Sequence, residues 1–182
     1  LSLIVVLISA FSLSAWGGEE IISNTFSSTT MQKSVSSYTD TWNNISGTEL
    51  KLVNFNNNQK GWTYVKCGRK NTASIGTITT TSPLTEKITK VEVTIDAVTA
   101  SKINSTYLQV ASDSSFTQNV QKVIVTIAEK GTITYEIPTP TSNCYYRLTY
   151  DCASGSSNGL VTISKVDFYY NSLREMETKK IN

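Results

Sequence analysis

The amino-acid sequence predicts an all-β protein, an antiparallel β-sandwich, from its composition and from its pattern of apolar residues. Serine and threonine make up 50 of the 182 residues, and there are nine tyrosines but only three prolines. Threonine and tyrosine fit a pleated, half-buried surface, whereas a helical domain would show apolar residues three and four positions apart. A jelly roll of about eight strands fits this pattern best, and an immunoglobulin-like sandwich of about seven strands is the alternative.

Strict alternation of apolar and polar residues is explicit in three segments. Positions 91, 93 and 95 are apolar while positions 92, 94 and 96 are polar, and residues 123–127 repeat the pattern. In residues 144–152, even positions carry Cys, Tyr, Leu, Tyr and Cys, and odd positions carry Tyr, Arg, Thr and Asp. This period of two is typical of strands with one face in the core and one face in solvent.

Turn-forming residues separate these runs at short intervals and define the remaining strands. Asn56-Asn57-Asn58, Lys130-Gly131 and the run from Gly155 to Gly159 are examples. The strands are expected near residues 20–26, 48–55, 61–67, 73–80, 88–98, 105–111, 120–128, 131–137, 143–152 and 159–170. The stretch from Ser27 to Asn44 shows little periodicity and is expected to be a long surface connection.

The first residues predict export. Residues 1–15 are uncharged and mostly apolar, as in the hydrophobic region of a signal peptide, and small residues allow cleavage after Ala15 or Gly17. The basic start of such a signal is missing, so the sequence resembles a fragment. We therefore expect a signal peptide at 1–17, one sandwich domain at 18–171 and a charged tail or linker at 172–182. The mature protein is expected to be secreted or at the cell surface, with no membrane segment after cleavage.

Three cysteines leave an odd one in an oxidising compartment. Cys144 and Cys152 lie about 26 Å apart along one extended strand, which is too far for a disulfide. Cys67 could pair with either of them, and Cys67–Cys152 is the favoured pairing if a disulfide forms. The alternative is that all three are small buried thiols that pack as apolar residues.

The composition argues against catalysis and against nucleic-acid binding. The chain has no histidine, which excludes Ser-His-Asp and Cys-His hydrolases and the usual zinc hydrolases. Glycoside hydrolysis by two carboxylates remains, but spacing selects no pair among the scattered candidates. These candidates are Glu92, Asp96, Asp113, Glu136, Asp151 and Asp167. The formal charge of +2 is not gathered into a basic block, so no nucleic-acid partner and no enzyme activity are expected.

Aromatic residues among amides and cations are the candidate binding groups. A sugar ring stacks its apolar face on Trp or Tyr, while Asn, Arg and Lys bind its hydroxyl groups. The richest region runs from Trp42 to Lys70. Its candidate ligand-binding residues are Trp42, Asn56, Asn57, Trp62, Tyr64 and Arg69. For both tryptophans the alternative is a position in the core of the sandwich.

Several of these segments together resemble accessory β-sandwich domains of secreted bacterial proteins, modules similar to galactose-binding-like jelly rolls. The segments lie within residues 48–170 and carry strand and turn signatures. They are Gly61–Gly68, Ile88–Asp96, Val110–Phe116, Asn158-Gly159 and Ile163–Tyr169. The resemblance implies glycan binding, and sometimes a structural calcium ion. No calcium-ligand spacing is recognisable, so no cofactor is assigned.

Two functions therefore follow from the sequence. The first is a secreted, non-catalytic binding module that is glycan-binding or adhesive, with a glycan or a cell-surface protein as partner. The alternative is a structural or protein-interaction domain, accessory to a hydrolase encoded elsewhere in the parent protein.

Overall fold

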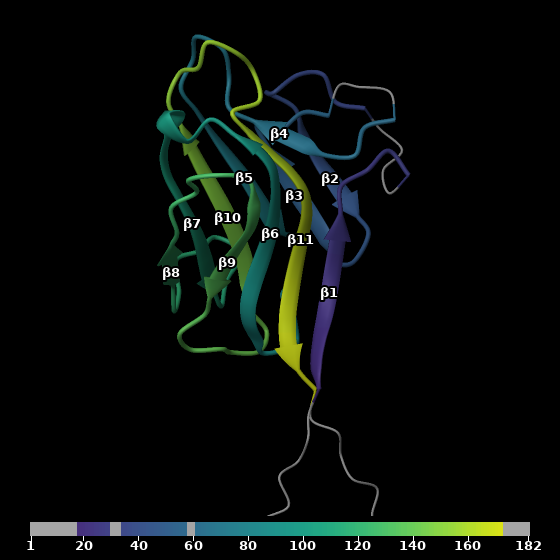
Figure 1. The fold of residues 1–182 in the computed structure, drawn as a ribbon. Coiled ribbons are helices and arrows are strands. Elements are labelled where there is room, and N and C mark those ends of the chain that lie inside the picture. Colours follow the sequence, from purple (N-terminus) through teal and green to yellow (C-terminus); the bar gives the residue numbers. More distant parts are fainter. Residues whose placement is uncertain (1–17, 30–33, 58–60, 173–182) are drawn as a thin grey trace, which may run out of the picture.

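The computed structural model describes residues 18–29, 34–57 and 61–172, which form two antiparallel sheets packed face to face (Figure 1). The five-stranded sheet contains β1 (Glu19–Thr25), β4 (Val65–Cys67), β6 (Ile88–Val98), β9 (Gly131–Glu136) and β11 (Val161–Asn171). The six-stranded sheet contains β2 (Thr41–Ile45), β3 (Glu49–Val53), β5 (Ser74–Thr80), β7 (Ile103–Ala111), β8 (Gln121–Ile124) and β10 (Tyr145–Cys152). The predicted all-β sandwich is confirmed.

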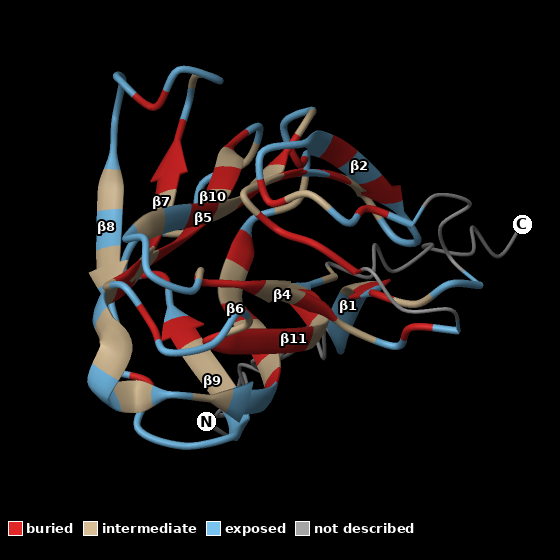
Figure 2. Cartoon of the chain, turned by 90° about the horizontal axis from the view of Figure 1, so that it is seen from above, coloured by how far each residue is buried: buried red, intermediate tan, exposed pale blue. Residues whose placement is uncertain are grey.

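The order of strands shows how the chain is distributed between the layers. The order is β1-β11-β6-β9 in one sheet, with β4 also paired to β11, and β2-β3-β5-β10-β7-β8 in the other. From β5 onward, every connection except the one between β7 and β8 crosses from one sheet to the other. Figure 2, which looks down on the sandwich, shows β4, β6, β9 and β11 on one side and β2, β5, β7 and β10 on the other. Neighbours in a sheet are therefore mostly far apart in the sequence.

Ten of the strands lie where the alternation predicts them, and one does not. The segment expected to be a surface connection, Ser27 to Asn44, contains most of β2 and is anchored by the buried side chains of Phe26 and Val35. Within β2, Trp42 and Asn44 point inward and their neighbours are exposed. A buried asparagine hides the apolar period, so this strand could not be recognised from its pattern. The strands expected at 61–67 and 120–128 are also shorter than predicted, at 65–67 and 121–124.

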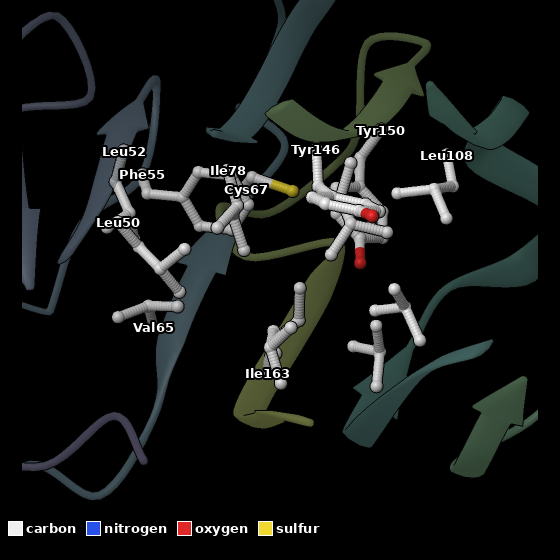
Figure 3. Close-up of a cluster of buried hydrophobic side chains, with 14 of the residues drawn as sticks. Leu50, Leu52, Phe55, Val65, Cys67, Ile78, Leu108, Tyr146, Tyr150 and Ile163 are labelled. Carbon is white, nitrogen blue, oxygen red and sulfur yellow. The ribbon is translucent and has the colours of Figure 1, made fainter. Parts of the chain in front are cut away.

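The core lies between the two sheets and is rich in aromatic rings (Figure 3). Tyr146 on β10 and Phe168 on β11 meet edge to face with ring centroids 5.6 Å apart, which joins the two sheets. Phe55 and Tyr150 form a second such pair at 6.1 Å. Only glycine fits at position 76 on β5, because a Cβ there would lie 2.8 Å from the Cβ of Cys67. Contacts between residues far apart in the sequence thus hold the two sheets in position against each other.

Helical structure in the described part of the chain is limited to one short 3-10 turn, Ala100–Lys102. No helix in these residues has the length and apolar character needed to cross a membrane. The predicted signal peptide, and the predicted tail apart from Ser172, lie outside the described residues. The domain boundaries therefore stay predictions.

Candidate functional site

The two tryptophans predicted as sugar-stacking platforms are buried in the core. Trp42 is 5% exposed and Trp62 is 3% exposed. Their rings meet edge to face with centroids 6.3 Å apart, and Trp42 Nε1 donates a hydrogen bond to the carbonyl of Phe55 at 3.0 Å. The expectation that these rings are exposed is wrong, because both are needed to cover the end of the core beside β2 and β4. The core position that the sequence left open is the observed one.

The two predicted asparagines hold the backbone rather than face solvent. The side-chain oxygen of Asn57 accepts a hydrogen bond from the backbone N–H of Val35, and Asn57 N–H donates to the Val35 carbonyl at 2.9 Å. The backbone of Asn56 exchanges two hydrogen bonds with Lys66, at 3.0 and 2.9 Å. Both asparagines are at most 2% exposed, so their side chains are not available to a ligand in this arrangement.

Tyr64 and Arg69 are the half-buried members of the predicted set. Arg69 bridges to Thr72, and its carbonyl accepts a hydrogen bond from the N–H of Gly155 at 3.0 Å. With four of the six predicted residues buried and these two half-buried, the set does not form an exposed aromatic platform. The sequence analysis predicted the ligand-binding site in the segment with the most aromatic residues. In the structure, the tryptophans of that segment are part of the hydrophobic core.

The cysteines predicted to pair lie together in the core as free thiols. Cys67 on β4 belongs to one sheet and Cys152 on β10 to the other, both are fully buried, and their thiols are hydrogen-bond partners. Burial raises the pKa of Cys67, whereas the hydrogen bond from Cys67 lowers the pKa of Cys152. Cys144 is also a buried free thiol. The Cys67–Cys152 disulfide remains a prediction.

The outer face of the six-stranded sheet carries a continuous row of polar side chains. Because alternate residues of a strand point to the same side, strand register places one side chain per strand directly opposite the next. In strand order the row is Asn43, Lys51, Thr79, Arg147, Gln109 and Lys122. At about 4.8 Å per strand, it extends over about 24 Å across the sheet. We call this the polar row.

Arg147 lies near the centre of the polar row and is held in place on two sides. Its Nε and Nη2 both donate to Gln109 Oε1, at 3.1 and 2.8 Å. Its guanidinium carbon lies 4.1 Å from the ring centroid of Phe116. A planar guanidinium stacked on a ring loses little freedom when it binds a further acceptor. Arg147 is therefore a pre-positioned donor in the middle of the face.

The other two cations of the row, Lys51 and Lys122, are exposed. Lys122 Nζ lies 3.8 Å above the ring centroid of Tyr107 on the neighbouring strand. The ion pairs among the described residues all involve Lys90 or Lys165, so none of the three cations of the row is neutralised by a described carboxylate.

The carboxylates at the margins of this face are occupied by neutral donors. Glu49 accepts a hydrogen bond from Asn43 Nδ2 at 2.8 Å and one from Thr81 Oγ1 at 2.9 Å. Asp151 accepts one from Asn104 Nδ2 at 3.1 Å. The polar row therefore keeps its three positive charges free for an external partner.

Five of the six carboxylates considered for catalysis are tied into structural contacts. Glu92 and Asp167 are directly opposite each other on β6 and β11, but Lys90 and Lys165 pair with them at 3.1 and 2.7 Å. Asp113 accepts hydrogen bonds from the N–H groups of Thr117 and Gln118, which lower its pKa. In the described residues no cluster of three His, Cys, Asp or Glu side chains could hold a metal ion. The candidate carboxylates, all of them in described strands and turns, therefore include no facing pair that is free of ion pairs.

Comparison with known proteins adds a weak structural likeness. The sequence matches no protein-family model and no curated protein. A solved structure similar to this chain is chitosan-binding module 1, derived from a chitosanase/glucanase of Paenibacillus sp. IK-5. It shares 17% sequence identity, covers 85% of this chain and 94% of its own, and superposes with a TM-score of 0.33. At this TM-score the likeness carries no argument about the ligand of this chain.

Proposed function

We propose that this protein is a non-catalytic carbohydrate-binding module of an exported protein, and that the outer face of its six-stranded sheet is the binding surface. The observation that supports the proposal is the polar row, an uninterrupted line of hydrogen-bonding side chains across six strands. A polysaccharide offers a line of hydroxyl groups of similar form. Its binding needs many spaced donors and acceptors rather than one deep pocket.

Apolar side chains beside the polar row suit the C–H faces of sugar rings. Ile45, Ile75 and Ile124 on this face are 65%, 51% and 66% exposed. They come from β2, β5 and β8, which are not neighbours in the sheet. Isolated apolar residues among polar ones suit an amphipathic sugar, and they do not form the large contiguous apolar patch that marks many protein interaction sites. This favours a glycan over the alternative of a protein-interaction domain.

Affinity electrophoresis through gels that contain soluble polysaccharides, together with a glycan array, tests this proposal. A matched pair of variants tests the location: Thr79→Trp fills the middle of the polar row, and Thr94→Trp makes the same change on the outer face of the other sheet. Both threonines are half-buried on a strand. We expect Thr79→Trp to weaken retention at least about ten-fold, which is about 1.4 kcal/mol, and Thr94→Trp to retain it. Failure of the wild-type protein to bind any glycan, or equal loss in both variants with both folded, contradicts the proposal.

A further inference from the structure

We infer that the glycan bound by this face is acidic and carries a negative charge on every second sugar. This inference rests on the proposed function and goes further by naming the class of ligand. It follows from where the three cations of the polar row lie and from what surrounds them.

The spacing of the cations is regular. Lys51 is on β3, Arg147 on β10 and Lys122 on β8, and one strand without a cation separates each from the next. Since neighbouring strands are about 4.8 Å apart, the cations recur at about 10 Å along the row. One sugar of an extended polysaccharide advances by roughly one strand spacing. A chain lying along the row therefore presents alternate sugars to the cations and the sugars between them to Thr79 and Gln109.

The charge on this face differs from that on the opposite face. Among outward-facing strand residues, the six-stranded sheet carries three cations and two carboxylates, Glu49 and Asp151. The five-stranded sheet carries three cations, Lys66, Lys90 and Lys165, and five carboxylates. These are Glu19, Glu92, Asp96, Glu136 and Asp167. An anionic chain is attracted to the first face and repelled by the second, so the sandwich offers it one side only.

Arg147 gives the central position a preference for oxyanions. Its Nε and Nη2 are engaged by Gln109, and Nη1 makes no hydrogen bond with a described residue. A guanidinium fixed in this way recognises carboxylate or sulfate through short, charge-assisted hydrogen bonds. Uronate and sulfate share this chemistry, and the probes below separate them.

Nucleic acid fits the face less well than an acidic glycan. A single strand has a phosphate on every nucleotide and needs exposed rings on which its bases stack. The ring of Tyr107 is covered by Lys122, and the ring of Phe116 is covered by Arg147. Among the described strand residues, Tyr145 is the one outward-facing aromatic of this sheet without such a cation, so the face offers charge at intervals but no series of stacking platforms.

Calorimetric titration of the whole chain with paired oligosaccharides tests the inference. The probe is a hyaluronan hexasaccharide, which has a carboxylate on every second sugar, and its partner is the same oligosaccharide with carboxyl groups reduced to alcohols. A chondroitin sulfate hexasaccharide with its carboxyl groups reduced, so that only sulfate charges remain, and a single-stranded oligonucleotide complete the set. We expect the acidic glycans to bind at least about ten-fold more tightly than the reduced one, and we expect this advantage to disappear near 1 M salt, where the Debye length is about 3 Å.

Three variants and one control test whether the preference for acidic glycans comes from the cations of the polar row. Lys51→Gln, Arg147→Gln and Lys122→Gln each remove one charge of the row, and Lys130→Gln removes one exposed charge from the loop before β9. We expect each row variant to weaken binding of the acidic hexasaccharide by about two- to five-fold, with the largest loss for Arg147→Gln, and the control to have no effect. Binding of the reduced oligosaccharide should change in none of them.

The outcomes separate this inference from the proposed function. Equal binding of the acidic and reduced oligosaccharides, abolished by Thr79→Trp, overturns the acidic ligand and leaves the glycan-binding face standing. Absence of binding to every glycan on the array overturns both. Equal or tighter binding of the oligonucleotide overturns the inference, because the face then responds to any polyanion. A loss in Lys130→Gln as large as in the row variants also overturns it.

Discussion

The outer faces of the two sheets are built on the same strand geometry but use their charges differently. On the five-stranded sheet, Lys90 pairs with Glu19 and Glu92, and Lys165 pairs with Asp167. On the six-stranded sheet, the cations of the polar row contact aromatic rings or solvent and no described carboxylate. Two cations of the first face are paired with carboxylates of the same face, whereas the cations of the second face have no carboxylate partner among the described residues.

This difference separates structural charges from binding charges. The pair of Lys165 with Asp167 is partly shielded, since the Asp167 side chain is only 8% exposed. Lys122 is exposed and stands over a ring. Exposed ion pairs contribute little to stability, while a charge that has lost its partner in a buried site is costly. The same substitution should therefore reduce the stability of the protein on the first face and leave it nearly unchanged on the second.

The largest expected effect comes from linking the sheets through their shared core. Refolding in the presence of oxidised glutathione, while both thiols are accessible, would form one S–S bond between Cys67 and Cys152, with release of two molecules of reduced glutathione. We expect a gain of about 2–4 kcal/mol in the free energy of unfolding and no change in glycan retention, since neither outer face is altered. Peptide mapping without reduction checks the bond, and denaturant unfolding checks the gain. A matched Cys144→Ser variant should still form the bond, and failure of the wild type to form it contradicts the prediction.

The second effect compares one lysine on each face. Lys165→Met removes the partner of a largely buried carboxylate, so we expect a loss of about 2 kcal/mol in the free energy of unfolding. Lys122→Met removes an exposed, unpaired cation and should change that free energy by less than about 0.5 kcal/mol. Urea denaturation of the two variants beside the wild type makes the measurement. Equal losses in both would remove the distinction between the faces.

The smallest expected effect is on the loss of stability at acidic pH, and it concerns Glu92. Burial alone would raise the pKa of Glu92, but hydrogen bonds from Tyr169, at 2.8 Å, and from Lys90 hold it below its usual value of 4.5. A carboxylate whose pKa is lower in the folded state stabilises the fold above its unfolded pKa, and this stabilisation is lost as pH falls through the folded pKa. We expect Glu92→Gln to reduce the loss of stability between neutral pH and about pH 3 by less than about 1 kcal/mol. Unfolding curves at several pH values check this, and an unchanged acid dependence argues against the pairing.

The strands could be predicted because alternation is a local property. In β10, the buried Tyr146, Leu148 and Tyr150 alternate with the half-buried Tyr145, Arg147 and Asp151, as their order in the sequence indicates. Only Thr149 departs, since it is buried on the outer side. Strand β2 escaped prediction because its inward asparagine has no apolar signature.

The candidate site could not be predicted in the same way. The aromatic content of the sequence predicted Trp42 and Trp62 as ligand-binding residues. A large aromatic ring, however, packs in the core of a small sandwich as readily as it stacks on a ligand. Arg147, Gln109 and Lys122 carried no local signal, since each is one polar residue in an alternating strand. A search for outward-facing cations on predicted strands would have selected Lys51, Arg147 and Lys122, but also Lys66, Lys90 and Lys165.

The sequence by itself determined the class of fold, most of the strands and which side of each strand is polar, because these depend on residues two positions apart. Tertiary structure decided which strands are neighbours, and so which polar residues form a row. Lys51, Arg147 and Lys122 lie far apart in the chain and are aligned only by cross-strand hydrogen bonding between strands from distant segments. It also decided which aromatic residues are buried, since that depends on the shape of the space left between two sheets rather than on any local pattern.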